Sequence, residues 1–141
     1  MILIDANLLL YAYDSASAQH QPARRWLEAA FSGPHPVRMA WVTVLAFLRI
    51  ATNPRLSRVI ALSEAISIVD DWFAQPNFAL LPPGDRHWSI LASLLSEAQA
   101  RGPLAMDAHL AALAIEHGAT LCSADRDFSR FPGLKYENPL A

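Results

Sequence analysis

Three aspartates stand where acidic side chains could perform chemistry. Asp5 directly follows the apolar run Met1–Ile4, and Asp125 comes soon after a second apolar run at residues 119–122. Asp107 stands near the start of an alanine-rich segment that leads into this second run. Carboxylates that share a buried site either raise one another's pKa or hold a hard cation such as Mg²⁺. A site of that kind suits hydrolysis of a phosphodiester by a metal-activated water.

Ordinary structural roles are alternatives for these acids. Asp107 could be a helix cap, and Asp125 could be a turn residue or cap the segment that follows it. A small phosphohydrolase with Asp5 as nucleophile is a further alternative. That mechanism favours a second Asp two residues later and a well-placed lysine, whereas the chain has Asn7 and a single lysine, Lys135. The residue types therefore favour the metal-assisted reaction.

The elements that must position the acids follow an α/β pattern, in which short apolar runs alternate with longer segments of helical periodicity. The runs predicted to be strands are residues 1–4, 36–40, 78–81, 119–122 and 134–136. Such a pattern indicates a parallel sheet covered by helices on both faces. Ligands bind beyond the carboxyl ends of these strands, where Asp5 and Asp125 are expected. A helix that precedes a parallel strand begins at the same edge, which predicts that Asp107 joins them.

Helix boundaries are predicted from proline, glycine and capping residues. Pro22 is expected to be the first residue of a helix, and Ser63 and Asp85 are expected to cap two later helices. Asp107 is expected to open a helix that closes at Gly118. The tryptophans lie on or beside helical apolar stripes and are expected in the core or in an interface. These tryptophans are Trp26, Trp41, Trp72 and Trp88.

Composition places the chain among single globular domains, here residues 1–141. Hydrophobic residues make up 53% of the 141 positions and charged residues 17%, which is too apolar for a disordered chain. The longest apolar stretch, residues 40–50, contains Arg49 and is shorter than the roughly 20 residues that span a membrane. The start lacks the basic region of a secretory signal, so a cytoplasmic protein is expected. A single cysteine, Cys122, excludes an internal disulfide and a thiolate zinc cluster.

Four segments resemble PIN-domain ribonucleases of the VapC type, the toxins of toxin–antitoxin pairs. These segments are Ile2–Leu9, Phe47–Pro54, Asp107–Ala112 and Ser123–Phe128, and they follow the family order along nearly the whole chain. The resemblance implies a three-layer fold with a short, twisted parallel sheet flanked by helices. It implies a Mg²⁺- or Mn²⁺-dependent endoribonuclease that cleaves an RNA such as a tRNA or a ribosomal RNA loop. It also implies a homodimer that a cognate VapB-type antitoxin holds inactive.

The resemblance also implies roles for individual residues. Asp5 and Asp107 match the principal metal ligands of the family, and Asp125 matches the last acid of the site. Asn7 matches a polar residue that supports the first aspartate from the side. Thr43 falls near a Ser or Thr that is often present in that region and is assigned the same supporting role.

One position departs from the family pattern. The family usually carries a Glu directly before the residue that is Phe47 here, whereas this chain has Ala46. The site would thereby lose one carboxylate, and Asp127 is a candidate to replace it as a metal ligand. A catalytically degenerate domain that binds RNA or a partner protein without cleaving is therefore an alternative function.

Positive charge is concentrated in one part of the chain. Residues 24–58 contain six arginines and one acid, whereas residues 59–97 contain five acids and one arginine. This segment is expected either to bind a polyanion or to form a solvated surface. Arg49 and Arg55 flank the end of a predicted helix and are candidates to hold RNA phosphates. The alternative is that they neutralise the aspartates.

Overall fold

The computed structural model describes residues 1–55 and 58–141, and its secondary structure follows the predicted α/β order. The strands are β1 (Ile2–Ile4), β2 (Val37–Met39), β3 (Phe78–Leu80), β4 (Thr120–Cys122) and β5 (Tyr136–Glu137). The helices are α1 (Ala6–Ala12), α2 (His20–Ser32), α3 (Trp41–Ala51), α4 (Leu62–Phe73), α5 (His87–Glu97) and α6 (Leu104–His117). A short 3₁₀ helix, η1 (Arg126–Arg130), follows β4.

The sheet has five strands in the order β3-β2-β1-β4-β5, and every adjacent pair is parallel. β1 lies in the centre, with Leu3 opposite Leu121 and Ile4 opposite Cys122 of β4. Strands covered on both faces are apolar throughout, which explains the short apolar runs of the sequence. Because β1 and β4 are parallel neighbours, the residues that follow them, Asp5 and Ser123, emerge side by side at the carboxyl edge of the sheet.

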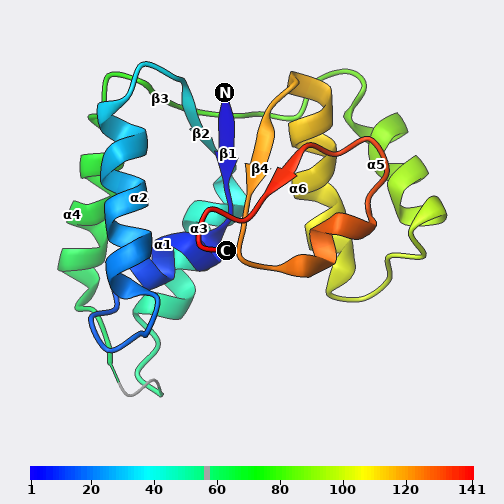
Figure 1. Ribbon diagram of the computed structural model, residues 1–141. Coiled ribbons are helices and arrows are strands. Elements are labelled where there is room, and N and C mark those ends of the chain that lie inside the picture. Colours follow the sequence, from blue (N-terminus) through cyan, green and yellow to red (C-terminus); the bar gives the residue numbers. More distant parts are fainter. Residues whose placement is uncertain (56–57) are drawn as a thin grey trace.

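Two helical layers cover the sheet, with α1 to α4 on one face and α5, α6 and η1 on the other (Figure 1). Side chains alternate between these layers: Ile4 and Cys122 pack towards α1–α4, whereas Leu3 and Leu121 pack towards α5 and α6. The α1–α4 side is filled by large rings, and the rings of Phe47 and Trp72 meet edge to face at 4.8 Å. On the other side, α6 adds small residues to a core that also contains Leu113 and Phe128. The fully buried alanines of α6 are Ala108, Ala111, Ala112 and Ala114.

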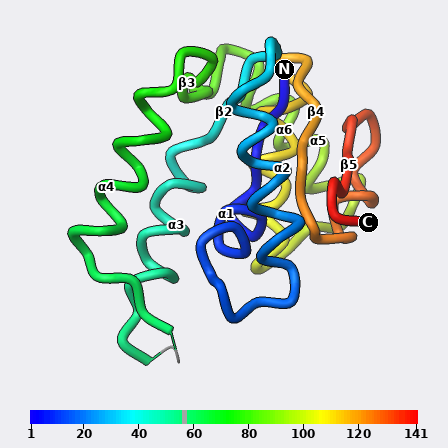
Figure 2. The backbone as a smooth tube through the Cα atoms, turned by 60° about the vertical axis from the view of Figure 1, so that its left-hand side comes forward, coloured from blue at the N-terminus to red at the C-terminus, as the bar shows by residue number. Residues whose placement is uncertain are grey.

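The helices α3 and α4 extend to one side of the sheet. The two helices lie side by side in Figures 1 and 2, and their linked ends reach beyond the carboxyl end of β1. The segment that carries Arg49 and Arg55 therefore lies on the same side of the molecule as the residues after β1. None of the helices that the structure describes is both long and apolar enough to cross a membrane.

Several predicted helix starts were wrong. α4, α5 and α6 begin at Leu62, His87 and Leu104, and none of them has a side-chain cap. Ser63 therefore lies inside α4, and Asp107 lies inside the first turn of α6 instead of opening it. Acidic and hydroxyl residues are common both at the cap and in the first turn of a helix. Their position in the sequence therefore does not tell which of the two places they occupy.

Two other helix predictions can be compared with the structure. Pro22 lies in the first turn of α2, where its missing N–H has no helical acceptor to lose, although the helix begins at His20. Gly118 ends α6 in the left-handed conformation, at φ 69°, as the sequence predicted.

Candidate metal centre

Four aspartates lie at the carboxyl edge of the sheet, where the sequence predicted an acidic site. Asp5 follows β1 and caps α1 by accepting a hydrogen bond of 2.8 Å from the N–H of Ala6. Asp125 follows β4 and caps η1 by accepting a hydrogen bond of 2.9 Å from the N–H of Asp127. Asp107 reaches the same edge from the first turn of α6. The cap that the sequence left open for Asp125 thus coexists with a shared site, whereas Asp107 lies in the first turn of α6 and does not cap it.

Three of the carboxylates form a compact cluster. Asp107, Asp125 and Asp127 each offer an oxygen atom, and these atoms all lie within 4.8 Å of one another. Asp5 is not one of the three, yet its charge acts on Asp107 and the charge of Asp125 acts on Asp5. A set of carboxylate oxygens suits a hard cation such as Mg²⁺ or Mn²⁺. The residues present therefore fit a divalent ion.

Burial and repulsion between carboxylates raise the pKa of Asp107 and of Asp5. Burial, followed by the charges of Asp125, Asp5 and Asp127, raises the pKa of Asp107 from 3.8 to about 6. Burial also raises the pKa of Asp5, against hydrogen bonds from Ser123 and Ala6 that lower it. A bound cation would oppose the repulsion directly, because it favours the ionised form of every carboxylate around it.

A buried serine links the ends of β1 and β4. Ser123 is fully buried, and its hydroxyl donates a hydrogen bond of 2.8 Å to Oδ2 of Asp5. Oγ of Ser123 also accepts hydrogen bonds of 3.0 Å from Nδ2 of Asn7 and from the N–H of Asp125. Oδ1 of Asn7 accepts from the N–H of Ala124 at 3.2 Å. Asn7 thus reaches Asp5 through Ser123, which holds the carboxylate in one orientation.

Sequence reasoning missed two residues of this region. Ser123 is one of them, and only its place directly after the strand next to β1 could have pointed to it. The other is Arg130, whose guanidinium lies 3.5 Å from Oδ1 of Asp127 at i,i+3 spacing. Its charge lowers the pKa of Asp107, against the raising contributions. The signal for Arg130 was the spacing, because residues three apart share a helix face.

The position of the absent Glu lies on α3. Ala46 is half-buried there, and Thr43, one turn earlier, is buried with its Oγ1 free of hydrogen-bond partners among the described residues. In the described part of the chain, no hydrogen bond therefore joins Thr43 Oγ1 to the aspartates. The supporting role of Thr43 stays a prediction.

The arginine-rich segment does not form one uniform surface. Arg24 pairs with Glu28 at 2.8 Å, and Arg38 donates hydrogen bonds to backbone carbonyls. Arg49 and Arg55 are both exposed, and no ion pair among the described residues uses them. These two remain the candidates for contacts with a polyanion.

Comparison with known proteins identifies the family and the fold of this chain. The PIN domain family model matches residues 2–134. Ribonuclease VapC37 of Mycobacterium tuberculosis is 46% identical over 142 residues, which cover 100% of this chain and 99% of that protein. Ribonuclease VapC33 of the same organism is 39% identical over 141 residues, which cover 99% of each. The crystal structure of VapBC2 from Rickettsia felis, bound to a promoter DNA fragment, superposes with a TM-score of 0.74 at 17% identity and 98% coverage of both chains.

The chain therefore belongs to the PIN-domain family. Within that family its similarity over the full length is to the VapC ribonucleases. The three-layer fold that the resemblance implied is confirmed, with a parallel five-stranded sheet between two helical layers.

Proposed function

We propose that the protein is a toxin endoribonuclease that hydrolyses RNA phosphodiester bonds with the help of a divalent metal ion. The observation that carries this proposal is the carboxylate cluster of Asp107, Asp125 and Asp127, whose oxygens lie within 4.8 Å of one another. Asp5 stands beside this cluster and repels it electrostatically. Membership of the VapC ribonucleases supplies the substrate class, and a tRNA or a ribosomal RNA loop is the substrate that we expect.

The four aspartates would hold Mg²⁺ or Mn²⁺. When bound, the ion supplies an activated water and stabilises the negative charge that develops on the phosphate. Ser123 and Asn7 keep Asp5 oriented, so that its carboxylate does not need to reorganise when the site fills. Asp125 uses one oxygen as a helix cap and has its other oxygen available for a ligand.

Asp127 is the residue that makes up for Ala46. Its carboxylate oxygen completes the cluster with Asp107 and Asp125, so four acids, with Asp5 included, would be available to a bound ion. The alternative function is a degenerate PIN domain that binds RNA or a partner without cleaving, and Ala46 is the observation that favours it. The two functions differ in whether metal-dependent products form.

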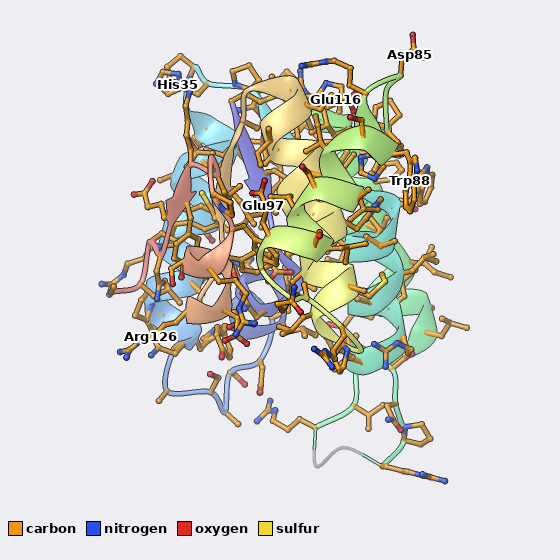
Figure 3. All side chains as sticks on the ribbon, turned by 90° about the vertical axis from the view of Figure 1, so that its right-hand side faces the viewer. His35, Asp85, Trp88, Glu97, Glu116 and Arg126 are labelled. Atoms are coloured by element: carbon orange, nitrogen blue, oxygen red, sulfur yellow. The ribbon has the colours of Figure 1, made fainter. Side chains whose placement is uncertain are left out.

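The proposal includes two protein partners. Trp41 and Leu45 on α3 are each 58% exposed, and Trp88 on α5 is 69% exposed and points outwards in Figure 3. Exposed rings and aliphatic side chains of this size are typical of protein interfaces. They support the homodimer and the contact with a cognate VapB-type antitoxin that the family resemblance implies. A cytoplasmic location follows from the same proposal, because its RNA substrates are there.

The test is cleavage of total cellular RNA by the purified protein in Mg²⁺, in Mn²⁺ and in EDTA. The chain, Asp5→Asn and Ala46→Glu are compared with the matched control Asp85→Asn, an exposed acid in the loop before α5 (Figure 3). Discrete products that require metal, survive in Asp85→Asn and vanish in Asp5→Asn are the expected result.

Three other results would each favour a different function. Cleavage by Ala46→Glu alone would identify a PIN domain whose chemistry was lost with the carboxylate. Absence of cleavage by every folded variant would favour the binding domain. Turnover of a generic phosphomonoester with RNA left intact would instead favour the phosphohydrolase.

A further inference from the structure

Arg130 lies at the edge of the acidic cluster, and buried neighbours in the sequence anchor its backbone. Arg130 is the last residue of η1, a segment fixed by the Asp125 cap at its start. Phe128 and Phe131, on either side of Arg130, are 0% and 3% exposed and pack in the core beneath α6. The backbone that carries Arg130 is therefore anchored, while its side chain points out to the cluster and reaches Asp127.

The contact between Arg130 and Asp127 is loose. Their charged atoms are 3.5 Å apart, and the two side chains are 38% and 51% exposed. An exposed pair of this kind adds little to the stability of a fold, since water and salt screen it. The placement of Arg130 is therefore better explained by a ligand than by stability, and the ion pair is weak enough to exchange.

Arg130 is distinguished from the other arginines by the charge that it faces. Among the described residues, it is the one cation that forms an ion pair with an acid of the cluster. Arg126 begins the same short helix and is exposed, and no ion pair in the part of the chain that the structure describes joins it to the cluster. Figure 3 places Arg126 at the outer side of the molecule.

We propose that Arg130 positions the RNA by binding a phosphate oxygen next to the acidic cluster, exchanging Asp127 for the phosphate. This inference rests on the proposed function. A guanidinium presents parallel N–H donors that match two phosphate oxygens, which a carboxylate cluster by itself repels. With Arg130 at its edge, the cluster offers a phosphate one attractive group in the absence of metal. The phosphate held there lies beside the carboxylates that would hold the ion.

The proposed role has a signature that a merely structural role lacks. Removal of the guanidinium takes an attractive group away from RNA, but it also leaves the carboxylates more negative. Arg130→Gln should therefore weaken RNA binding and tighten binding of Mn²⁺. A residue that only kept η1 folded would weaken both, because Asp125 and Asp127 belong to that segment.

The experiment measures both affinities on the full chain. Binding of a short, fluorescein-labelled single-stranded RNA is followed by anisotropy in EDTA and in Ca²⁺, and binding of Mn²⁺ by calorimetry without RNA. The variants are Arg130→Gln, the charge-retaining Arg130→Lys and the matched control Arg126→Gln, with unfolding transitions recorded for each.

For Arg130→Gln we expect RNA binding about tenfold weaker, the effect of one lost charge-assisted hydrogen bond. We expect Mn²⁺ binding about threefold tighter, as suits one exposed charge. Arg130→Lys should keep part of the RNA affinity, and Arg126→Gln should match the parent in both. Equal RNA binding by the parent and Arg130→Gln, or weaker binding of both ligands by Arg130→Gln, overturns the inference. A parent that neither binds nor cleaves RNA overturns the proposed function and this inference with it.

Discussion

Two carboxylates at opposite ends of α6 have opposite surroundings. Near the first turn, Asp107 faces Asp125, Asp5 and Asp127, and burial with these charges raises its pKa to about 6. Near the last turn, Glu116 accepts hydrogen bonds of 2.8 Å and 2.9 Å from the N–H groups of Gly84 and Arg86. The Gly84 N–H is the largest of the effects that lower the pKa of Glu116. In Figure 3 Glu116 lies by the loop that carries Asp85.

The helix dipole does not explain this difference. A dipole favours negative charge at the start of a helix and disfavours it at the end, which is the reverse of the two shifts. Local partners decide the outcome, because one acid meets hydrogen-bond donors and the other meets acids. Glu116 is a structural carboxylate whose charge is satisfied within the chain. Asp107 faces three acids and, among the described residues, one opposing cation, Arg130, so its charge is poorly compensated within the chain.

The largest difference between the carboxylates at the two ends of α6 is expected in RNA cleavage. Asp107→Asn removes one carboxylate from the cluster, and we expect RNA cleavage to fall by more than about 100-fold, the upper range for disturbing a ligand's partner. Glu116→Gln is the matched control, and its rate should stay near that of the parent. Initial rates on a cleaved RNA in Mg²⁺ check this prediction. Similar losses in both variants would contradict the difference between the two carboxylates.

A smaller loss of metal affinity and cleavage is expected when the hydrogen bond that orients Asp5 is removed. Ser123→Ala takes the hydroxyl donor from Asp5 and leaves Nδ2 of Asn7 without its acceptor. We expect metal affinity and cleavage to fall by about 10- to 100-fold, as for other groups that orient ligands. Ser129→Ala, which alters an exposed hydroxyl on η1, is the control and should have no effect. An unchanged metal affinity in Ser123→Ala would show that Asp5 needs no such orientation.

Low pH should reduce metal-dependent cleavage, because it protonates Asp107. Its raised pKa means that a proton occupies the carboxylate below about pH 6 and must leave before an ion binds. Metal-dependent cleavage should therefore rise about tenfold per pH unit up to pH 6 and then level off. Rates measured across this range in saturating RNA, with the fold checked by circular dichroism, test the prediction. A flat profile between about pH 5 and pH 7 would place the proton elsewhere.

Without metal, substitutions of the carboxylates at the two ends of α6 should change the stability of the protein in opposite directions. The raised pKa of Asp107 means that its contribution to stability is present below pH 3.8 and is lost as the pH rises through about 6. Asp107→Asn should thus stabilise the metal-free protein at neutral pH, by about 1 kcal/mol after allowance for solvent screening. The lowered pKa of Glu116 has the reverse sign, so Glu116→Gln should be less stable than the parent. Urea unfolding in EDTA measures both, and a destabilised Asp107→Asn would argue against repulsion at this site.

The sequence predicted where the acids meet because strand order and strand polarity are encoded in simple patterns. Four apolar residues before Asp5 and another run before Asp125 sufficed to place both at one edge, once the sheet was taken as parallel. The place of Asp107 followed from the direction of the helix before β4. These inferences needed only the chain direction at each strand.

Details that depend on partners could not be predicted in the same way. In α4 the spacing of Ile66, Val69 and Phe73 predicts one apolar face, and this was wrong: packing buries Ile68 and Trp72 and leaves Ile66 49% and Phe73 41% exposed. Trp88 is predicted in the core or in an interface, and its 69% exposure excludes only the core. Ser123 and Arg130 gain their importance from contacts with Asp5 and Asp127, which no local pattern specifies.

The most direct test of the metal centre is calorimetric titration of Mn²⁺ into the metal-free protein at neutral pH. Parent, Asp107→Asn and Glu116→Gln are compared, with the same protein concentration and with unfolding transitions recorded for each. The carboxylate cluster predicts saturable binding in the parent and in Glu116→Gln, and its loss in Asp107→Asn. Absence of binding in the parent, or unchanged binding in Asp107→Asn, would contradict the assignment of these aspartates to a metal ion.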